Sequence, residues 1–114
     1  MMTGSVAEKS RKQPEQSNAN RWLRATLDEA PALYAHADAY KQIDANTCPI
    51  LFMVGEHDLP SRNQKSREKL EGLGIKTGVK VFADGRHGCW NRSPWLEQMV
   101  DEMHRFFQQN LSVD

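Results

Sequence analysis

The sequence is poor in cysteine, in long apolar runs and in charge of one sign. Cys48 and Cys89 are its two cysteines, too few for a disulfide framework, and they are not spaced as a C-x-x-C pair. Fifteen lysines and arginines balance fifteen aspartates and glutamates. No excess of charge therefore favours a nucleic acid or an anionic membrane as a partner. Because no run approaches the roughly 18 apolar residues of a membrane span, we also expect no membrane-spanning segment.

The first twenty residues lack the apolar side chains that a folded segment needs. Val6 is their one branched apolar residue, and most of the others are polar or charged. Such a segment buries too little surface to offset the entropy lost on ordering. We therefore predict a disordered tail over residues 1–20 and a single folded domain over residues 21–114. The tail also lacks the apolar core of a signal peptide, so the default localisation is cytoplasmic unless a targeting segment precedes it.

Two stretches in the second half of the chain have the pattern of strands. Residues 50–54 are a continuous apolar run between Pro49 and Gly55. Continuous rather than alternating hydrophobicity is typical of a strand that is buried on both faces, as in a parallel sheet. Residues 79–82 predict a second, short strand.

Helical patterns follow both predicted strands. The polar stretch from Ser61 to about Leu73 contains good helix formers, and Gly74 is a natural stop after it. Ser93-Pro94 is typical of a helix start, with the serine as N-cap and the proline at the first position. The amphipathic stripe of this last helix, which we expect to pack in the core, consists of Trp95, Met99, Val100, Met103, Phe106, Phe107 and Leu111.

The predicted elements from residue 49 onward alternate as strand, helix, strand, helix. This order favours an α/β fold with parallel strands and right-handed crossovers. Before them, the sequence predicts a short helix over residues 29–36, with Asp28 as its candidate N-cap. Two strands do not make a stable parallel sheet, and open strand edges need partners. We therefore expect the chain to be part of something larger, or to pair with another chain through its strand edges.

Each predicted strand is followed by a loop with residues suited to acid–base chemistry. Asp58 follows the first strand and His87 follows the second. The carboxyl ends of parallel strands meet at the edge where open α/β sheets bind their ligands. An aspartate there accepts the Nδ1–H of an imidazole and stabilises the imidazolium, which leaves Nε2 as a general base. The sequence therefore predicts an Asp58–His87 couple.

Three segments resemble the C-terminal part of α/β-hydrolases. Residues 49–58 resemble the strand and acid turn of that family, residues 85–90 its histidine loop, and Pro94-Trp95 with the following helix its closing helix. Within the superfamily, the chain is most similar to the esterase and lipase branch of acetyl-esterase-like enzymes, near serine peptidases of the prolyl oligopeptidase type. The resemblance covers roughly residues 28–111.

This resemblance implies two members of a Ser-Asp-His triad, with Asp58 as the acid and His87 as the base. The family's order places the nucleophile before the acid. No G-x-S-x-G elbow and no H-G-G-G oxyanion loop precedes Asp58, and Gly4-Ser5 is not such an elbow. The resemblance thus implies only the C-terminal part of an α/β-hydrolase fold, in a serine carboxylic-ester hydrolase.

A segment of this kind is expected to be inactive alone and to act on a small ester only when an N-terminal half completes it. A truncated gene product, a misplaced start codon and one half of a split enzyme all fit the pattern. The serine-triad mechanism implies no cofactor. A serine peptidase of the prolyl oligopeptidase type is an alternative, and a non-catalytic interaction domain that pairs through an open sheet edge is another.

Neighbouring residues leave other interpretations open. Asp58 alone would suit a turn or a helix N-cap, and His87 would suit a surface loop. Glu56 is a competing carboxylate, although it lies closer to the strand. A metal site formed by His57, Asp58 and His87 has no strong ligand spacing to support it. Cys89 is a candidate replacement nucleophile, but it follows the histidine by two residues, too close along the loop to be oriented against it easily.

Further polar and aromatic residues are assigned less specific roles. Arg86 and Arg92 suit either an anionic substrate group or a solvated loop. Trp90 suits a packing residue or a pocket wall. His104 is expected to be exposed on the last helix, and His36 is expected to be structural or exposed.

Overall fold

The computed structural model describes residues 17–111, and the chain divides into two compact units, residues 1–44 and residues 45–114. Residues 1–16, most of the predicted tail, lie outside the described residues. The first described helix, α2 (Asn18–Leu23), begins within the last residues of that predicted tail. None of the helices over residues 17–111 has the length and apolarity that crossing a membrane requires.

The first unit contains three short helices, α2, α3 (Pro31–Ala37) and α4 (Ala39–Gln42). Tyr34 on α3 is buried. Its hydroxyl donates a hydrogen bond to the side-chain oxygen of Asn20 and lies 3.2 Å from the carbonyl oxygen of Ala25. A buried tyrosine needs such polar partners for its hydroxyl. Tyr34 is thus one of the buried residues of this unit, together with Ile43 and Ser17.

The predicted N-cap of α3 is wrong. Ala30, not Asp28, occupies that position, and no side chain caps the helix. The helix begins at Pro31, whose ring forces the preceding residue out of the helical region and so sets the boundary. Upstream, the backbone N–H of Thr26 donates to Glu29 and the backbone N–H of Glu29 donates to the Thr26 hydroxyl, at 2.8 and 3.2 Å.

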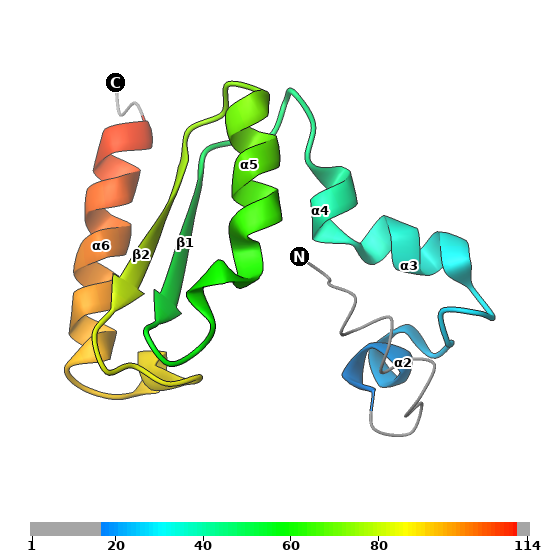
Figure 1. Ribbon diagram of the computed structural model, residues 1–114, viewed down its shortest axis with the longest axis horizontal. Helices are drawn as coiled ribbons and strands as arrows, with labels where there is room; N and C mark the ends of the chain where they lie inside the picture. Colours follow the sequence, from blue (N-terminus) through cyan, green and yellow to red (C-terminus); the bar gives the residue numbers. More distant parts are fainter. Residues whose placement is uncertain (1–16, 112–114) are drawn as a thin grey trace. The chain divides into compact units, whose positions relative to one another are not determined.

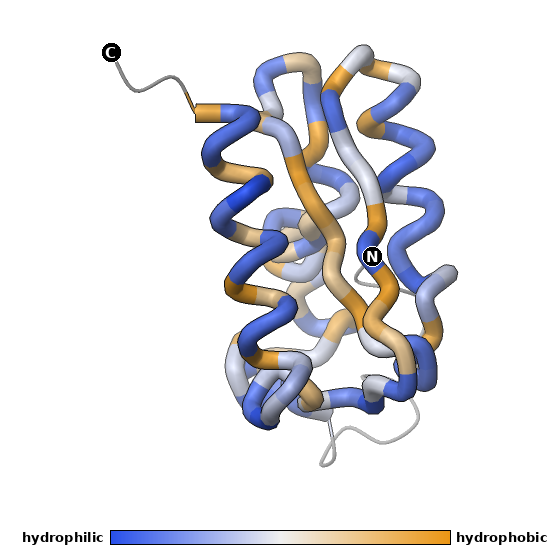
Figure 2. Tube along the Cα trace, turned by 90° about the vertical axis from the view of Figure 1, so that its left-hand side faces the viewer, coloured by the Kyte–Doolittle hydropathy of each residue, from blue (hydrophilic) through white to orange (hydrophobic). Residues whose placement is uncertain are grey.

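The second unit is a mixed α/β arrangement built on two parallel strands. Strands β1 (Ile50–Gly55) and β2 (Thr77–Phe82) pair in parallel, with Ile50 opposite Thr77 and Gly55 opposite Phe82. Helices α5 (Gln64–Gly72) and α6 (Trp95–Asn110) flank the strands (Figure 1). Figure 2 shows hydrophobic residues along both strands and in bands along α6. The predicted order of strand, helix, strand, helix and the parallel pairing are both confirmed.

Strand β1 is less buried than its continuous apolar run predicts. Its first four residues are half-buried, and only Val54 and Gly55 are buried. The sheet consists of β1 and β2 alone within residues 17–111, so the other edge of β1 has no paired strand there. A run of apolar residues suited to the middle of a larger sheet therefore lies at an edge.

The segment after β1 turns back through a 3-10 helix, η2 (Pro60–Asn63), into α5. Of its two expected anchors, Leu70 is fully buried while Leu73 is exposed. Gly74 ends the helix as predicted, with a φ of +74°. The N–H groups of Gly74 and Ile75 donate to the carbonyl oxygens of Glu71 and Leu70, at 3.0 and 2.9 Å. These two bonds form a Schellman motif that satisfies carbonyls at the helix end.

Helix α6 begins one residue later than its sequence signal predicts. Pro94 is the N-cap rather than the first helical residue, and Ser93 does not cap the backbone. Instead, the Ser93 hydroxyl donates a hydrogen bond to the side chain of Glu97. The predicted N-cap is therefore wrong, because the serine hydroxyl is engaged by a carboxylate within the first turn.

The predicted core role of the α6 stripe holds for only part of it. Met99 is buried against Phe82 and Cys89, and Trp95 packs on the same cluster. The stripe's exposed members are Val100, Met103, Phe107 and Leu111. The reason is the small size of the sheet: within residues 17–111, two strands cannot cover the full width of an amphipathic helix.

Candidate active site

The loops that follow β1 and β2 are tied together at the carboxyl end of the sheet. The N–H of Glu56 donates to the carbonyl oxygen of Phe82, and the N–H of His57 donates to that of Gly85, both at 2.9 Å. A Cβ atom at Gly55 would lie 2.3 Å from the Gly85 carbonyl oxygen. Glycine at position 55 is therefore what allows the two loops to approach this closely.

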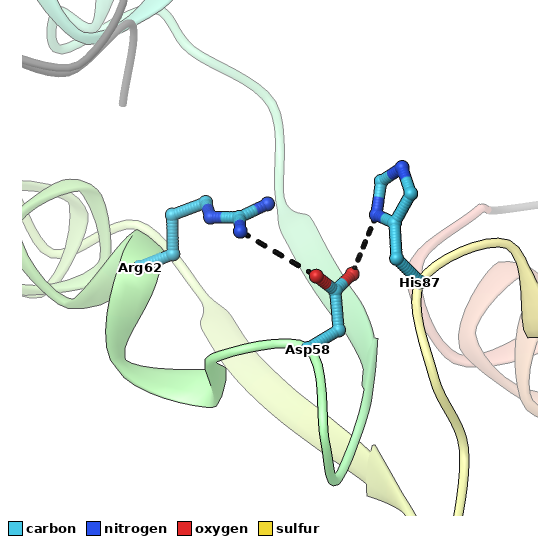
Figure 3. Close-up of polar contacts among 3 residues, drawn as sticks. All are labelled: Asp58, Arg62 and His87. Atoms are coloured by element: carbon cyan, nitrogen blue, oxygen red, sulfur yellow. Dashed lines mark hydrogen bonds and ion pairs between the residues drawn. The ribbon is translucent and has the colours of Figure 1, made fainter.

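This close approach brings Asp58 and His87 together, as predicted. Oδ2 of Asp58 lies 2.9 Å from Nδ1 of His87 (Figure 3). The Asp58 side chain is 14% exposed and the His87 side chain 72% exposed. The second ring nitrogen points away from Asp58 in Figure 3. An ionised aspartate accepts a hydrogen bond from a protonated Nδ1, which leaves Nε2 as the basic nitrogen.

Arg62 is a third member of this group that sequence reasoning missed. Its Nη2 atom lies 3.4 Å from Oδ1 of Asp58, the carboxylate oxygen that His87 does not use. The sequence signal was the spacing of four residues, which brings Arg62 of η2 within reach of Asp58 in the preceding turn. Arg62 therefore holds the carboxylate from the side opposite the imidazole.

Trp90 contacts the imidazole from its own loop. The rings of His87 and Trp90 meet edge to face, with centroids 5.2 Å apart and planes at 84°. Such a contact is a favoured aromatic geometry. The Trp90 side chain is itself 46% exposed, so the predicted packing role extends only to this surface contact with the imidazole.

The competing carboxylate, Glu56, belongs to a different group. Its Oε2 atom accepts the backbone N–H of Asp84 at 2.8 Å, so it ties the two loops rather than contacting His87. Nε2 of His57 lies 3.9 Å from Oδ1 of Asp84. The ligand atoms of Glu56, His57 and Asp84 all lie within 4.8 Å of one another, and the three residues are exposed.

That exposed trio is the one set over residues 17–111 that could hold a metal ion, and the sequence did not predict it. The set considered from the sequence, His57 with Asp58 and His87, is not gathered within the same range. His87 does contact Asp58, but His57 lies near Asp84 instead. The metal hypothesis for that set is therefore wrong.

Cys89 is placed as a packing residue. It is 6% exposed and lies in the cluster with Phe82 and Met99. A replacement nucleophile has to reach substrate, and a buried thiol behaves as a small apolar side chain. His36 and His104 are both exposed and lie on other elements.

An open hollow of about 510 Å³ includes His87 in its lining. Its wall includes the two loop arginines, Arg86 and Arg92, together with Asp84, and Trp95 and Cys89 contribute apolar surface. No serine or cysteine within residues 17–111 hydrogen bonds to His87. The described part of the chain therefore presents an acid and a base beside a hollow, without a nucleophile positioned against the base.

Comparisons of the chain with models of protein families, with curated proteins and with solved structures find no match.

Proposed function

We propose that this chain is the C-terminal segment of a serine carboxylic-ester hydrolase of the α/β-hydrolase type. The observation that carries the proposal is the 2.9 Å contact between Oδ2 of Asp58 and Nδ1 of His87, at the carboxyl end of two adjacent parallel strands. This is where open α/β sheets place their sites. The proposed fold extends beyond this chain, and β1 and β2 would be the last two strands of its sheet.

In the proposed reaction, Nε2 of His87 accepts the proton of a serine hydroxyl as the serine oxygen attacks the ester carbonyl. The tetrahedral intermediate then collapses to an acyl-serine, and His87 gives its proton to the departing alcohol. A water molecule, deprotonated by the same nitrogen, releases the acid. Asp58 keeps Nδ1 protonated and stabilises the imidazolium that forms in each step.

The serine and the oxyanion donors come, in this proposal, from residues outside this sequence. Support for an additional segment comes from the incomplete cover of β1 and from the exposed apolar residues of α6. Both features suit strands and helices that would complete a larger sheet. The chain by itself is then expected to lack hydrolase activity, since neither the attacking atom nor the oxyanion donors are present.

The test is to express the chain together with the polypeptide encoded directly upstream of it, and to measure hydrolysis of p-nitrophenyl acetate. We expect activity in the joined protein and a loss of roughly a thousandfold or more in kcat for His87→Ala, since the base acts in both halves of the reaction. His104→Ala is the matched control, because His104 is an exposed histidine on α6, and it should leave kcat unchanged.

An upstream sequence without a strand followed by a G-x-S-x-G serine would contradict the proposal. So would full activity in the His87→Ala variant. The peptidase alternative uses the same triad, and a peptide p-nitroanilide assayed beside the ester distinguishes the two leaving groups.

A second candidate function is a non-catalytic interaction domain that pairs through its open sheet edge. The observation that favours it is the half-buried strand β1, whose other edge has no paired strand within residues 17–111. Sedimentation of the purified chain over a range of concentrations is the measurement. Stable pairing that persists in His87→Ala, combined with no hydrolysis by the joined protein, would favour this candidate over the hydrolase.

A further inference from the structure

We propose that the hollow beside His87 binds an anionic group, a carboxylate or a phosphate, so that the site takes esters carrying a negative charge. This inference rests on the proposed function and names its substrate class. It starts from the lining of the hollow, which brings Arg86 and Arg92 together with His87. A ligand held by the two guanidinium groups would lie against the same imidazole that serves as the base.

The two arginines of the hollow differ from the other arginines of the second unit. Arg62 pairs with Asp58, Arg105 pairs with Glu102 at 3.0 Å, and Arg67 donates to a backbone carbonyl. Within residues 17–111, neither Arg86 nor Arg92 forms an ion pair. Two unpaired guanidinium groups on one concave surface match the planar, bidentate recognition of carboxylate and phosphate.

The one acidic residue in the lining does not cancel this charge. Asp84 lies within 3.9 Å of His57, and its backbone N–H is held by Glu56. The lining thus carries two positive side chains against one negative, even with a neutral His87. An anion in the hollow would gain charge–charge attraction from both arginines, and a neutral ligand would lack this attraction.

The apolar part of the hollow indicates the chemistry of the uncharged portion of the ligand. Trp95 lies in the wall with its ring oriented by a hydrogen bond from its indole N–H to the carbonyl oxygen of Ala83, at 2.9 Å. Cys89 adds a second apolar side chain. A short hydrocarbon portion placed against Trp95, with an anionic end at the arginines, matches both halves of this surface.

The test is a titration of the isotopically labelled full chain by NMR, followed at the side-chain N–H groups of Arg86, Arg92 and Trp95. The probes are monomethyl succinate, which is an anionic ester, inorganic phosphate, and dimethyl succinate as the neutral match. We expect saturable shifts with the two anions and none with the neutral ester. Tighter binding of monomethyl succinate assigns the hollow to a carboxylate, and tighter binding of phosphate assigns it to a phosphate.

Arg86→Gln and Arg92→Gln should each weaken anion binding about tenfold, as expected for the loss of one charged hydrogen-bonding partner. Arg105→Gln is the matched control, because Arg105 is an exposed arginine outside the hollow, and it should leave binding unchanged. Equal binding of the neutral ester, equal weakening by Arg105→Gln, or no saturable shift would overturn the inference.

Failure of this inference and failure of the proposed function give different results. Binding is read without turnover, so an anion that binds while the joined protein shows no hydrolysis refutes the hydrolase and leaves the binding site. The joined protein could instead hydrolyse neutral and anionic esters with equal kcat/KM, and its Arg86→Gln variant could show the same equality. That result refutes the anionic substrate class alone.

Discussion

Asp58 and His87 are 29 positions apart in the chain, yet one carboxylate oxygen and one ring nitrogen lie at hydrogen-bonding distance. The other carboxylate oxygen is held by Arg62. An aspartate fixed from two sides has one orientation in which to meet the imidazole. At the scale of single residues, the candidate base is an exposed histidine whose Nδ1 meets Asp58 and whose side chain lines the hollow.

The first prediction concerns that tautomer. Asp58→Asn places an amide N–H₂ opposite Nδ1 of His87, which favours the proton on Nε2 and removes the basic nitrogen from the open side. We expect the ring ¹⁵N shifts of neutral His87 to show Nδ1–H in the natural chain and a substantial Nε2–H population in the variant. Glu56→Gln should leave the tautomer unchanged, since Glu56 contacts Asp84. Equal tautomer ratios in all three proteins would contradict the Asp58–His87 contact.

The second prediction concerns Gly55. An alanine there would bring its Cβ into the backbone of Gly85, and overpacking against backbone that cannot move aside lowers the free energy of unfolding by about 3 kcal/mol. Urea unfolding measures the change. Gly72→Ala is the control, since nothing lies within 4 Å of a Cβ at that position, and we expect its effect to stay within about 1 kcal/mol. Similar losses in both variants would refute the close approach of the two loops.

Helix α6 shows, at the scale of an element, that residues of one amphipathic stripe can differ in burial. Met99 faces the sheet and is 6% exposed, while Met103, one turn later, is 37% exposed. The spacing that places apolar residues on one side of a helix does not specify how wide the surface opposite it is. The exposed half of the stripe is surface that a larger fold or a partner would cover.

The third prediction uses this pair of methionines. Met99→Ala should lower the free energy of unfolding by about 2–5 kcal/mol, because it leaves a cavity in the cluster with Phe82 and Cys89. Met103→Ala should cost less than about 1 kcal/mol, since its side chain is already in contact with water. Both are measured by urea unfolding. Equal costs would mean that the stripe is packed along its whole length.

The fourth prediction concerns the start of α6. The pKa of Glu97 is lowered from its ordinary value of 4.5, first by the hydrogen bond from the Ser93 hydroxyl and then by a backbone hydrogen bond. The ionised Glu97 carboxylate, held by these hydrogen bonds, therefore stabilises the folded state above pH 4.5. This contribution is lost as the pH falls through the lowered pKa.

Ser93→Ala should raise the pKa of Glu97 toward 4.5, as followed by NMR titration of its carboxyl carbon. Natural chain and variant should then differ in stability above that pH and converge in strong acid. Glu102→Gln is a control on the same helix, because Glu102 pairs with Lys80 and Arg105 and not with Ser93. A Glu97 titration that Ser93→Ala leaves unchanged would contradict the hydrogen bond.

At the scale of the whole chain, two compact units differ in what holds them. The first buries Tyr34, Ile43 and Ser17 among short helices, and the second is built on a two-stranded parallel sheet with flanking helices. A parallel sheet this small is rarely stable by itself. The candidate site depends on the second unit, because both loops of the Asp58–His87 couple lie there.

Local sequence patterns determined the order and type of the elements in the second unit. The apolar run at 50–54, the glycine at position 74 and the helical spacing after Pro94 act over a few residues, so they can be interpreted without a partner segment. The pairing of Asp58 with His87 could also be anticipated, because parallel strands deliver both loops to one edge. The burial of individual side chains could not be predicted in this way, and β1 and α6 are more exposed than their apolar residues predict.

Side-chain contacts that spacing alone does not specify decided the rest. Ser93 bonds to Glu97 instead of capping α6, Cys89 is buried by Phe82 and Met99, and Arg86 and Arg92 share one hollow with His87. Each of these outcomes depends on which surface lies opposite a side chain, and a sequence pattern specifies the direction of a side chain but not what it meets. Residue type and spacing therefore determined the elements and the acid–base pair, whereas the limited extent of the sheet determined which apolar side chains stay exposed.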